Sequence, residues 1–300
     1  MVEAIYRAHA FADAETPVIL HGESGSGKTF FAEYIHELSQ RAGGFHAFSV
    51  GTVAPQLALD ELFGHVEGAY TDARKMRPGR IATAGGGTLL LDDVQNLDLG
   101  SQKQFLQVLD RRTYSPVGSD RVLTVACRIV LAMTEDPERL MQQGQLLKDL
   151  RYRFGMCAIR IPSLSERREE IPLLAMHALE RCPETTKVAG PARISNAALA
   201  ALKEAEFCGN VRELTAAIEY AYLMARAANA TEIGEGHLPD GLCPRLLYQR
   251  WGDRATNRLV VERALKRTGG SVKEAAQLLG ISRTAVHALL SRARVTSSAS

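Results

Sequence analysis

The stretch that decides the fold reads Gly22-Glu23-Ser24-Gly25-Ser26-Gly27-Lys28-Thr29. It matches the P-loop pattern at every fixed position. The apolar run Pro17-Val18-Ile19-Leu20 enters it and a helical pattern from Phe30 leaves it, which is the strand–loop–helix context of a P-loop. Its glycines allow backbone N–H groups to turn inward around phosphate oxygens, and the helix N-terminus adds a favourable dipole. The stretch therefore predicts a binding site for nucleotide phosphates, with a flexible Gly/Ser turn as the alternative.

An acidic pair downstream supplies the second half of such a site. The run Gly85-Gly86-Gly87-Thr88-Leu89-Leu90-Leu91-Asp92-Asp93 ends a buried strand on two carboxylates. In a P-loop NTPase, Lys28 is expected to reach the β- and γ-phosphates, and the Thr29 hydroxyl and Asp92 to hold Mg²⁺. Asp93 is expected to orient or deprotonate the attacking water. The predicted cofactors are therefore ATP and Mg²⁺.

The rest of the chain divides into segments of different character. Over the first 165 residues, short apolar runs such as Thr88–Leu91 and Arg128–Ala132 alternate with helical patterns, which predicts a parallel sheet flanked by helices. From about Glu169 to His237 the pattern is helical, and a cluster of Pro and Gly at 239–244 then marks a linker. We expect an αβα nucleotide-binding domain at 1–168, a helical domain at 169–238, a linker at 239–253 and a third, all-helical domain at 254–300.

Composition sets outer limits on the protein's class. Of 300 residues, 46% are hydrophobic and 23% charged, which is ordinary for a globular chain with a real core. No apolar run approaches the ~20 residues of a membrane span, and the N-terminus lacks the pattern of a secretory signal. The five cysteines lie 25 or more residues apart, a spacing that fits neither a zinc site nor a disulfide framework. We therefore expect a cytoplasmic protein, not associated with a membrane, with buried free thiols.

Charge is unevenly distributed along the chain. Residues 241–300 hold eleven Lys or Arg and three Asp or Glu, a net +8, whereas the whole chain carries only +2, which leaves −6 for residues 1–240. A basic tail on an acidic body predicts that the tail meets a polyanion such as DNA. A charged surface that contacts only water is the alternative.

The basic tail reads as three short helices. Residues 257–267 form the first, closed by Gly269-Gly270, and Ser271-Val272-Lys273-Glu274 is a capping box that opens the second. Gly280 makes the turn before the third helix, which enters the DNA major groove in a helix-turn-helix. The candidate DNA-binding residues are Arg283, Thr284 and His287 for base edges, Lys273, Arg292 and Arg294 for phosphates, and Ser282 as the cap of the third helix. A helical dimerisation module without DNA contact is the alternative.

Several further motifs resemble the AAA+ domain of the sigma-54 enhancer-binding proteins, also called NtrC-type activators. The similarity runs from near residue 4 to about residue 240. It is carried by the P-loop and by Glu61-Leu62-Phe63-Gly64-His65, Gly68-Ala69-Tyr70-Thr71-Asp72-Ala73, Ile161-Pro162-Ser163-Leu164 and Gly209-Asn210-Val211-Arg212-Glu213-Leu214. The basic tail is similar to the Fis-type DNA-binding domain of the same proteins.

The resemblance implies a fold class and a function. The fold is an α/β AAA+ P-loop NTPase, an αβα sandwich with a helical lid, followed by an all-α helix-turn-helix domain. The function is transcription regulation: ATP hydrolysis in a homo-oligomer, a dimer that assembles into a hexameric or heptameric ring, acts on sigma-54 RNA polymerase. DNA at upstream enhancer-like sites is the second partner.

The loop that contacts sigma-54 is the most diagnostic segment. In the family it reads Gly-Ala-Phe-Thr-Gly-Ala and pushes on sigma-54 as ATP is turned over. Tyr70 keeps the aromatic surface, whereas Asp72 replaces a glycine, adding a charge and removing a residue free to take positive φ. An ordinary surface loop is the alternative. The candidate sigma-54 contacts are Gly68, Ala69, Tyr70, Thr71, Asp72 and Ala73.

The resemblance also implies roles in hydrolysis. Most relatives have Glu where Asp93 stands, the family's sensor Asn aligns with Thr134, and the first of two trans-acting arginines aligns with Leu147. Arg153 matches the second of those arginines, and Arg212 is expected to read the γ-phosphate from the lid. The candidate catalytic residues are Asp93, Thr134 and Arg153. The candidate nucleotide ligands are Gly22, Glu23, Ser24, Gly25, Ser26, Gly27, Lys28, Thr29, Asp92 and Arg212, with Thr29 and Asp92 on the metal.

Departures from the family leave other functions open. Asp72, Asp93, Thr134 and Leu147 all differ at functional places, so a sigma-54-independent regulator that binds ATP and DNA but hydrolyses slowly is a second hypothesis. An AAA+ remodelling ATPase of another kind, such as a helicase loader or an unfoldase, is a third. Met1 begins inside the family's first helix, so we expect either control in trans or a truncated start.

Overall fold

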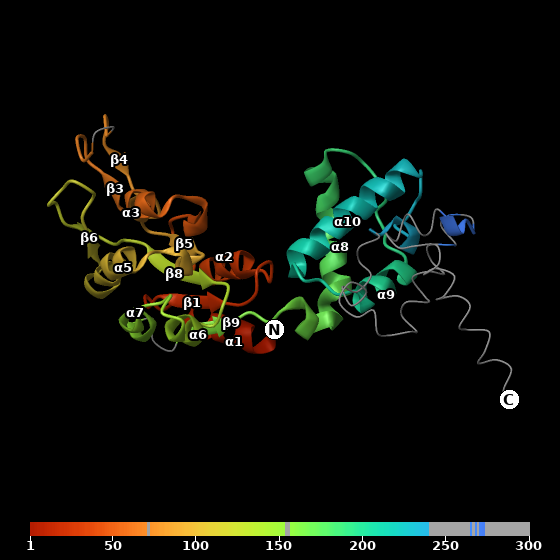
Figure 1. The fold of residues 1–300 in the computed structure, drawn as a ribbon, viewed down its shortest axis with the longest axis horizontal. Helices are drawn as coiled ribbons and strands as arrows, with labels where there is room; N and C mark the ends of the chain where they lie inside the picture. Colours follow the sequence, from red (N-terminus) through yellow and green to blue (C-terminus); the bar gives the residue numbers. More distant parts are fainter. Residues whose placement is uncertain (71–72, 154–156, 240–264, 266–267, 269, 274–300) are drawn as a thin grey trace. The chain divides into compact units, whose positions relative to one another are not determined.

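The computed structural model describes residues 1–70, 73–153, 157–239, 265, 268 and 270–273 (Figure 1). The chain divides into two compact units. The first comprises residues 1–203 with 207–238, and the second residues 204–206 with 239–300. The first unit carries the P-loop and the motifs that follow it.

A parallel five-stranded sheet forms the centre of this unit (Figure 1). Its strands run in the order β2 (Phe45–Ser49), β5 (Thr88–Asp92), β8 (Arg128–Met133), β1 (Val18–His21) and β9 (Ala158–Arg160). The three apolar runs that the sequence predicted as strands are β1, β5 and β8, so those predictions are confirmed. Two short antiparallel pairs stand apart from the sheet: β3 (Gly64–His65) with β4 (Arg77–Pro78), and β6 (Thr113–Tyr114) with β7 (Leu123–Thr124).

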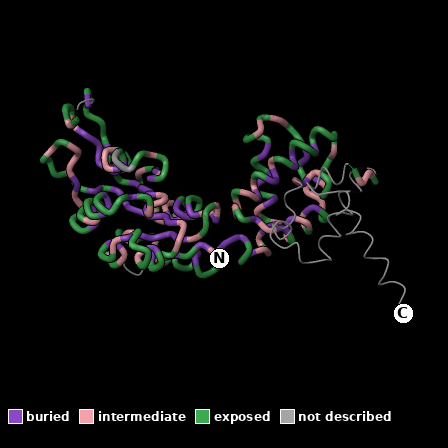
Figure 2. The backbone as a smooth tube through the Cα atoms, viewed as in Figure 1, coloured by how far each residue is buried: buried purple, intermediate pink, exposed green. Residues whose placement is uncertain are grey.

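Helices cover both faces of the sheet, and strand periodicity explains why. Successive side chains of a strand point to opposite faces. In β8, Ile129, Leu131 and Met133 join a core with α3, α5 and α7, whereas Val130 and Ala132 join a second core with α1 and α2. Since both faces are apolar, the three central strands β1, β5 and β8 are buried (Figure 2). The covering helices are α1 (Val2–Phe11), α2 (Lys28–Leu38), α3 (Pro55–Phe63), α4 (Arg80–Thr83), α5 (Leu99–Arg111), α6 (Pro137–Gln142) and α7 (Lys148–Arg153).

The segment after the sheet is helical, as predicted. It contains α8 (Ile171–Thr186), α9 (Asn196–Glu204) and α10 (Asn210–Ala227), with short 3-10 helices at Leu164–Glu170 and Glu235–His237. Small buried residues, among them Ala175 and Ala178 of α8 and Ala217 and Ala221 of α10, line these helices. A capping box formed by Ser163 and Glu166 begins the first of the 3-10 helices.

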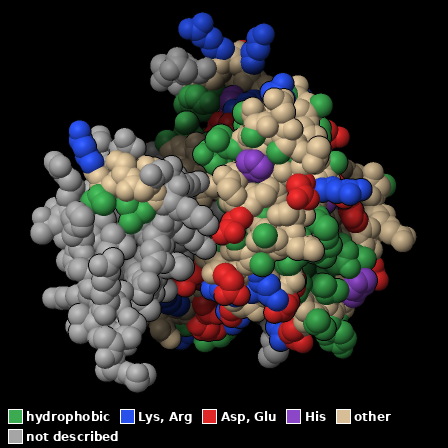
Figure 3. Space-filling model, turned by 90° about the vertical axis from the view of Figure 1, so that its right-hand side faces the viewer, with side chains coloured by type: hydrophobic (Ala, Val, Ile, Leu, Met, Phe, Trp, Pro, Cys, Tyr) green, Lys and Arg blue, Asp and Glu red, His purple; other side chains and the backbone are tan. Residues whose placement is uncertain are grey.

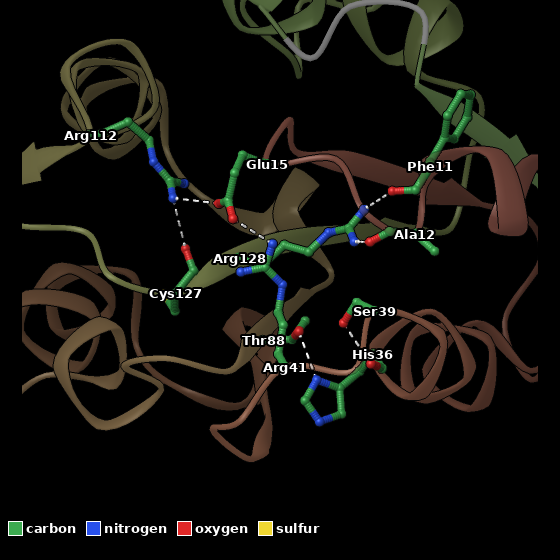
Figure 4. A network of polar contacts seen from close by, with 10 residues as sticks. All are labelled: Phe11, Ala12, Glu15, His36, Ser39, Arg41, Thr88, Arg112, Cys127 and Arg128. Carbon is green, nitrogen blue, oxygen red and sulfur yellow. Dashed lines mark hydrogen bonds and ion pairs between the residues drawn. The ribbon is translucent and has the colours of Figure 1, made fainter.

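A buried arginine ties α1 to the sheet (Figure 4). Arg128, the first residue of β8, is fully buried and donates hydrogen bonds to the backbone oxygens of Phe11 and Ala12 at the end of α1. Beside it, Glu15 accepts from Arg41 at 2.6 Å and from Arg112 at 3.1 Å. Carbonyl groups at a helix C-terminus lack partners within the helix, so Arg128 satisfies them there.

The described cysteines are free thiols in different environments. Cys127 and Cys182 are buried, Cys157 is half-buried and Cys208 is exposed. The prediction of buried thiols is therefore wrong for Cys208. It lies in the turn directly before α10, where its side chain is exposed between Gly209 and the buried Phe207.

Acidic, basic and apolar side chains are interspersed on the face seen in Figure 3. Within the described part of the chain, none of the helices combines the length and apolarity that a membrane span needs.

Candidate functional site

The P-loop joins β1 to α2 and has a backbone that glycine makes possible. Gly25 has φ +75° and Gly27 has φ +102°, in the left-handed region that other residues rarely adopt. A Cβ atom on Gly25 would lie 2.1 Å from the backbone oxygen of Gly209, so only glycine fits between the loop and α10. Gly27 is the N-cap residue of α2, and no side chain among the described residues caps that helix. Its first N–H groups are therefore available to an anion.

Lys28 holds its ammonium inside the loop. The side chain is buried, and its Nζ donates to the backbone oxygens of Gly22 at 2.8 Å and Glu23 at 3.0 Å. Burial lowers the pKa of Lys28, and the nearby Asp92 and Asp93 partly oppose that shift. A phosphate bound in this loop would meet the Lys28 ammonium, which already lies inside it.

The acidic pair lies at the carboxyl end of β5. Burial raises the pKa of Asp92, and the negative charge of Asp93 raises it further. Asp93 has φ +58°, and its backbone N–H donates to Asp92 Oδ1 at 2.9 Å. Because β5 and β8 are parallel neighbours, with Leu91 opposite Leu131, Thr134 follows β8 at the same edge of the sheet.

Two side chains that sequence reasoning missed contact Asp93. Gln95 Nε2 donates to Asp93 Oδ1 at 3.2 Å and to Thr134 Oγ1 at 3.1 Å. Ser49, the last residue of β2, donates from Oγ to Asp93 Oδ2 at 3.4 Å. The predicted catalytic pair of Asp93 and Thr134 is therefore brought together, with Gln95 between them.

The helical segment contacts the P-loop through several residues. Arg212 donates from its guanidinium to Ser24 Oγ at 3.0 Å, and the backbone N–H of Val211 donates to Gly25 O at 3.0 Å. Arg167 donates to the backbone oxygen of Ser26 at 2.6 Å. Arg212 thus contacts the P-loop, and its role toward the γ-phosphate stays a prediction.

Asn210 is a further contact that the sequence did not single out. It is buried and has φ +54°. Its Nδ2 donates to Glu23 Oε2 and to Ser24 O, both at 3.0 Å, and its Oδ1 accepts from the backbone N–H of Leu164 at 2.7 Å. The Gly-Asn-Val-Arg motif pointed to this segment, but only folding showed that the asparagine joins it to the P-loop.

The 68–73 loop connects β3 to β4. The backbone N–H of Gly68 donates to Ala73 O at 2.8 Å, and that of Ala73 donates to Tyr70 O at 2.9 Å. Tyr70 is 44% exposed, its ring lies 5.2 Å from the His65 ring, and its hydroxyl lies 3.4 Å from His65 Nδ1. The candidate contacts Thr71 and Asp72 lie outside the described residues.

The hairpin of β6 and β7 lies beside this loop. The backbone N–H of Val66 donates to Val117 O at 3.1 Å, and the N–H of Val117 donates to Gly64 O at 2.8 Å. The two loops are therefore hydrogen-bonded near their bases.

The candidate trans-acting arginine ends α7. The helix ends at Arg153, whose side chain lies outside the described residues. Leu147 precedes the helix, packs against the core and donates its N–H to Oε1 of the buried Gln102 at 2.9 Å. Gln102 also donates to the backbone oxygens of Gln145, in the same segment, and of Leu97, before α5, so its amide joins the segment before α7 to the start of α5.

Of the candidate DNA-binding residues, only Lys273 belongs to the described part of the chain. Ser282, Arg283, Thr284, His287, Arg292 and Arg294 lie outside it. Gly270 has φ +88° and donates its N–H to Leu265 O at 2.7 Å, a bond typical of a helix C-terminus. That bond agrees with a helix closed at this point.

Comparison with known proteins shows to which family the chain belongs. Residues 1–160, more than half of the chain, match the family model of the sigma-54 interaction domain. The chain belongs to the sigma-54 interaction domain family. Residues 165–246 match the AAA+ ATPase lid domain, and residues 258–288 match the bacterial regulatory proteins of the Fis family.

Individual relatives align with most of this chain. The transcriptional regulatory protein GlrR of Escherichia coli K12 is 35% identical over 97% of this chain and 66% of its own length. The transcriptional regulatory protein ZraR of the same organism is 36% identical over 94% of this chain and 64% of its own length. The chain thus spans slightly less than two thirds of these curated relatives.

A solved structure agrees with the fold. The crystal structure of NtrX from Brucella abortus in complex with ATP has a TM-score of 0.70 at 25% identity, covering 97% of this chain and 67% of that one. The predicted fold, an AAA+ P-loop NTPase with a helical lid and a Fis-type helix-turn-helix domain, is confirmed.

Proposed function

We propose that the chain is an ATP-dependent, DNA-binding regulator of transcription that remodels sigma-54 RNA polymerase through its 68–73 loop. The observation that carries the proposal is the convergence, at one edge of the sheet, of the P-loop, the acidic pair, Thr134 and Arg212. GlrR and ZraR are transcriptional regulatory proteins, and NtrX binds ATP, which supports the same assignment. A regulator of polymerase works in the cytoplasm.

The donors at the site fit a nucleotide with Mg²⁺. The uncapped N-terminus of α2 and the buried ammonium of Lys28 suit phosphate oxygens. The Thr29 hydroxyl and the Asp92 carboxylate are hard oxygen ligands of the kind that Mg²⁺ prefers. When bound, ATP with Mg²⁺ supplies the phosphoryl group whose transfer to water drives the cycle.

The residues of the chain then take separate parts in the proposed hydrolysis. Gly22 to Thr29 bind the phosphates, Asp92 and Thr29 hold the metal, and Asp93 with Thr134 orients the water. Arg212 senses the γ-phosphate from the lid, and Arg153 acts on the nucleotide of a neighbouring subunit in a ring. Such trans-acting arginines are worth roughly 10³–10⁵ in rate in phosphoryl transfer.

Chain order offers a route from the site to the loop. Ser49 contacts Asp93 and ends β2, which leads through the 3-10 helix Val50–Thr52 and α3 into the β3–β4 hairpin. We propose that a change at Asp93 on hydrolysis shifts this segment and raises the loop toward sigma-54. The segments 1–168, 169–238, 239–253 and 254–300 serve as nucleotide domain, lid, linker and DNA-binding domain.

The test is nucleotide-dependent binding to sigma-54. Wild-type protein is expected to co-migrate with purified sigma-54 in the presence of ADP–aluminium fluoride and not without nucleotide. Lys28→Ala should lose ATP binding by calorimetry and lose this co-migration, because it removes the ammonium of the P-loop. The exposed Lys103→Ala is the matched control and should behave as wild type.

Two results would contradict the proposal in different ways. Unchanged ATP affinity in Lys28→Ala would overturn the phosphate site. Wild-type protein that hydrolyses ATP but does not co-migrate with sigma-54 would support the sigma-54-independent regulator. If Asp72→Gly then recovered binding to sigma-54, Asp72 in the 68–73 loop would be the cause of the lost binding.

A further inference from the structure

The amide of Gln95 occupies the centre of the proposed hydrolysis site. Gln95 lies on the 3-10 helix Val94–Asn96, directly after the acidic pair. It donates from Nε2 to Asp93 Oδ1 at 3.2 Å and to Thr134 Oγ1 at 3.1 Å. Asp93 and Thr134 follow different strands, so the amide joins the end of β5 to the end of β8.

The hydrogen bonds of the Gln95 amide leave its oxygen, Oε1, available as an acceptor. A side-chain NH₂ has two hydrogens, and the two contacts account for both of them. The Oε1 atom is buried and has no hydrogen-bond partner among the described residues. Buried carbonyl oxygens are usually satisfied by protein or by ordered water. The site therefore offers an acceptor next to Asp93 and Thr134.

Asp93 and Thr134, the two residues that Gln95 joins, each differ from the residue that the family uses to orient the attacking water. Thr134 has a hydroxyl where the family aligns an asparagine amide, and Asp93 is one methylene shorter than the usual Glu. Besides Gln95, Asp93 has the side chain of Ser49 as a longer contact at 3.4 Å. The Asp93 carboxylate therefore has Gln95 as its shorter side-chain contact, at 3.2 Å.

We propose that Gln95 is the positioning residue of hydrolysis, holding Asp93 and Thr134 together so that the carboxylate faces the attacking water. The inference rests on the proposed ATPase function. In that step the water oxygen bonds to the γ-phosphorus, the bond from phosphorus to the β–γ bridging oxygen breaks, and a water proton passes to Asp93. The products are ADP and inorganic phosphate.

Substitutions of Gln95 separate positioning from binding. Gln95→Ala removes the amide, and Gln95→Glu keeps its length but removes both donors. Turnover by either variant is expected to fall about 10- to 100-fold, since errors near 1 Å at a reacting centre cost that much. Gln104→Ala, an exposed glutamine on α5, is the matched control and should keep wild-type turnover.

Affinities for two nucleotide probes distinguish this role from a merely structural one. The affinity for a non-hydrolysable ATP analogue should stay within about threefold of wild type, because Gln95 touches neither the P-loop nor Lys28 in the described contacts. The affinity for ADP–aluminium fluoride should fall in parallel with turnover. Equal losses for both probes would mean a damaged fold and would overturn the inference.

A double-mutant cycle tests whether Gln95 acts through Thr134. If Gln95 acts through Thr134, the loss in Gln95→Ala with Thr134→Ala is smaller than the product of the single losses. A multiplicative loss, or wild-type turnover in both Gln95 variants, overturns the inference while leaving the ATPase proposal in place. Absence of turnover in wild-type protein overturns both together.

Discussion

At the scale of single residues, Arg128 shows how a buried charge is accommodated. The side chain is fully buried, and burial lowers the pKa of Arg128. Its guanidinium compensates by donating to two backbone oxygens at the end of α1 (Figure 4). Removing one partner of a buried charged contact leaves the other unsatisfied, which is more costly than the contact is worth.

We expect Arg128→Met to lower the free energy of unfolding by about 3 kcal/mol, since it removes the Arg128 donor from Ala12 O and leaves Phe11 O with the backbone N–H of Ala14. The midpoint of urea unfolding followed by circular dichroism measures the effect. Arg111→Met, at an exposed position of α5, should leave the free energy of unfolding within about 0.5 kcal/mol of wild type. Equal effects of the two substitutions would contradict the anchoring role.

The thiols should differ sharply in reactivity. Burial raises the pKa of Cys127 and of Cys182 to about 11 each, whereas Cys208 is exposed. Because the thiolate is the reactive form, only about one in a thousand molecules of a thiol with pKa 11 is ionised at pH 8. Cys208 should therefore react with a thiol reagent at pH 8 in seconds to minutes, and Cys127 and Cys182 only after denaturation. Mass spectrometry of labelled peptides, with Cys208→Ser as control, checks the assignment.

At the scale of elements, the start of α10 contacts the P-loop through several hydrogen bonds. Asn210 makes three hydrogen bonds there, to Glu23, Ser24 and Leu164, from a left-handed backbone. Asparagine tolerates that backbone better than most residues. The same side chain thus permits the turn into α10 and joins the helix to the phosphate site.

Asn210→Ala is expected to lower ATP affinity roughly tenfold and to reduce stability by about 2–3 kcal/mol, because it loses these bonds and strains the backbone. Asn229→Ala is a matched control, since Asn229 also has a left-handed backbone, at φ +51°, but is exposed at the end of α10. It should lose some stability and bind ATP as wild type does. Calorimetric titration with ATP measures the affinities of wild type and of the two variants. Equal affinities in these three proteins would refute the role of Asn210.

At the scale of the whole molecule, the proposed function places the nucleotide between subunits of a ring. The segment before α7 is held by Gln102, which sets the start of the helix that ends at Arg153. If Arg153 reaches a neighbour's nucleotide, Arg153→Ala keeps nucleotide binding but loses most hydrolysis. Mixed with Lys28→Ala protein, it should regain part of the turnover at interfaces that combine an intact P-loop with an intact arginine. Turnover measured across mixing ratios, with co-assembly shown by sedimentation, tests this, and absence of rescue in co-assembled protein would count against a shared site.

Local patterns in the sequence determined the family and the fold class, and they predicted the main phosphate ligands. The P-loop, the acidic pair and the runs that form β1, β5 and β8 each depend on short, fixed spacings, because a loop or a strand is specified by neighbouring residues. The helical pattern after residue 169 was readable for the same reason. The resemblance to the family singled out Thr134 and Arg212, which contact Gln95 and Ser24 in the structure, while their roles toward a nucleotide stay predictions.

Only the tertiary structure decided how those pieces meet. Gln95 and Thr134 are separated by 39 residues, and Asn210 and Glu23 by 187, so no local pattern links them. They meet because β5 and β8 are parallel neighbours whose carboxyl ends share an edge, and because α10 begins against the P-loop. The exposure of Cys208 and the burial of Arg128 were likewise set by packing, since burial depends on residues that are distant in the chain.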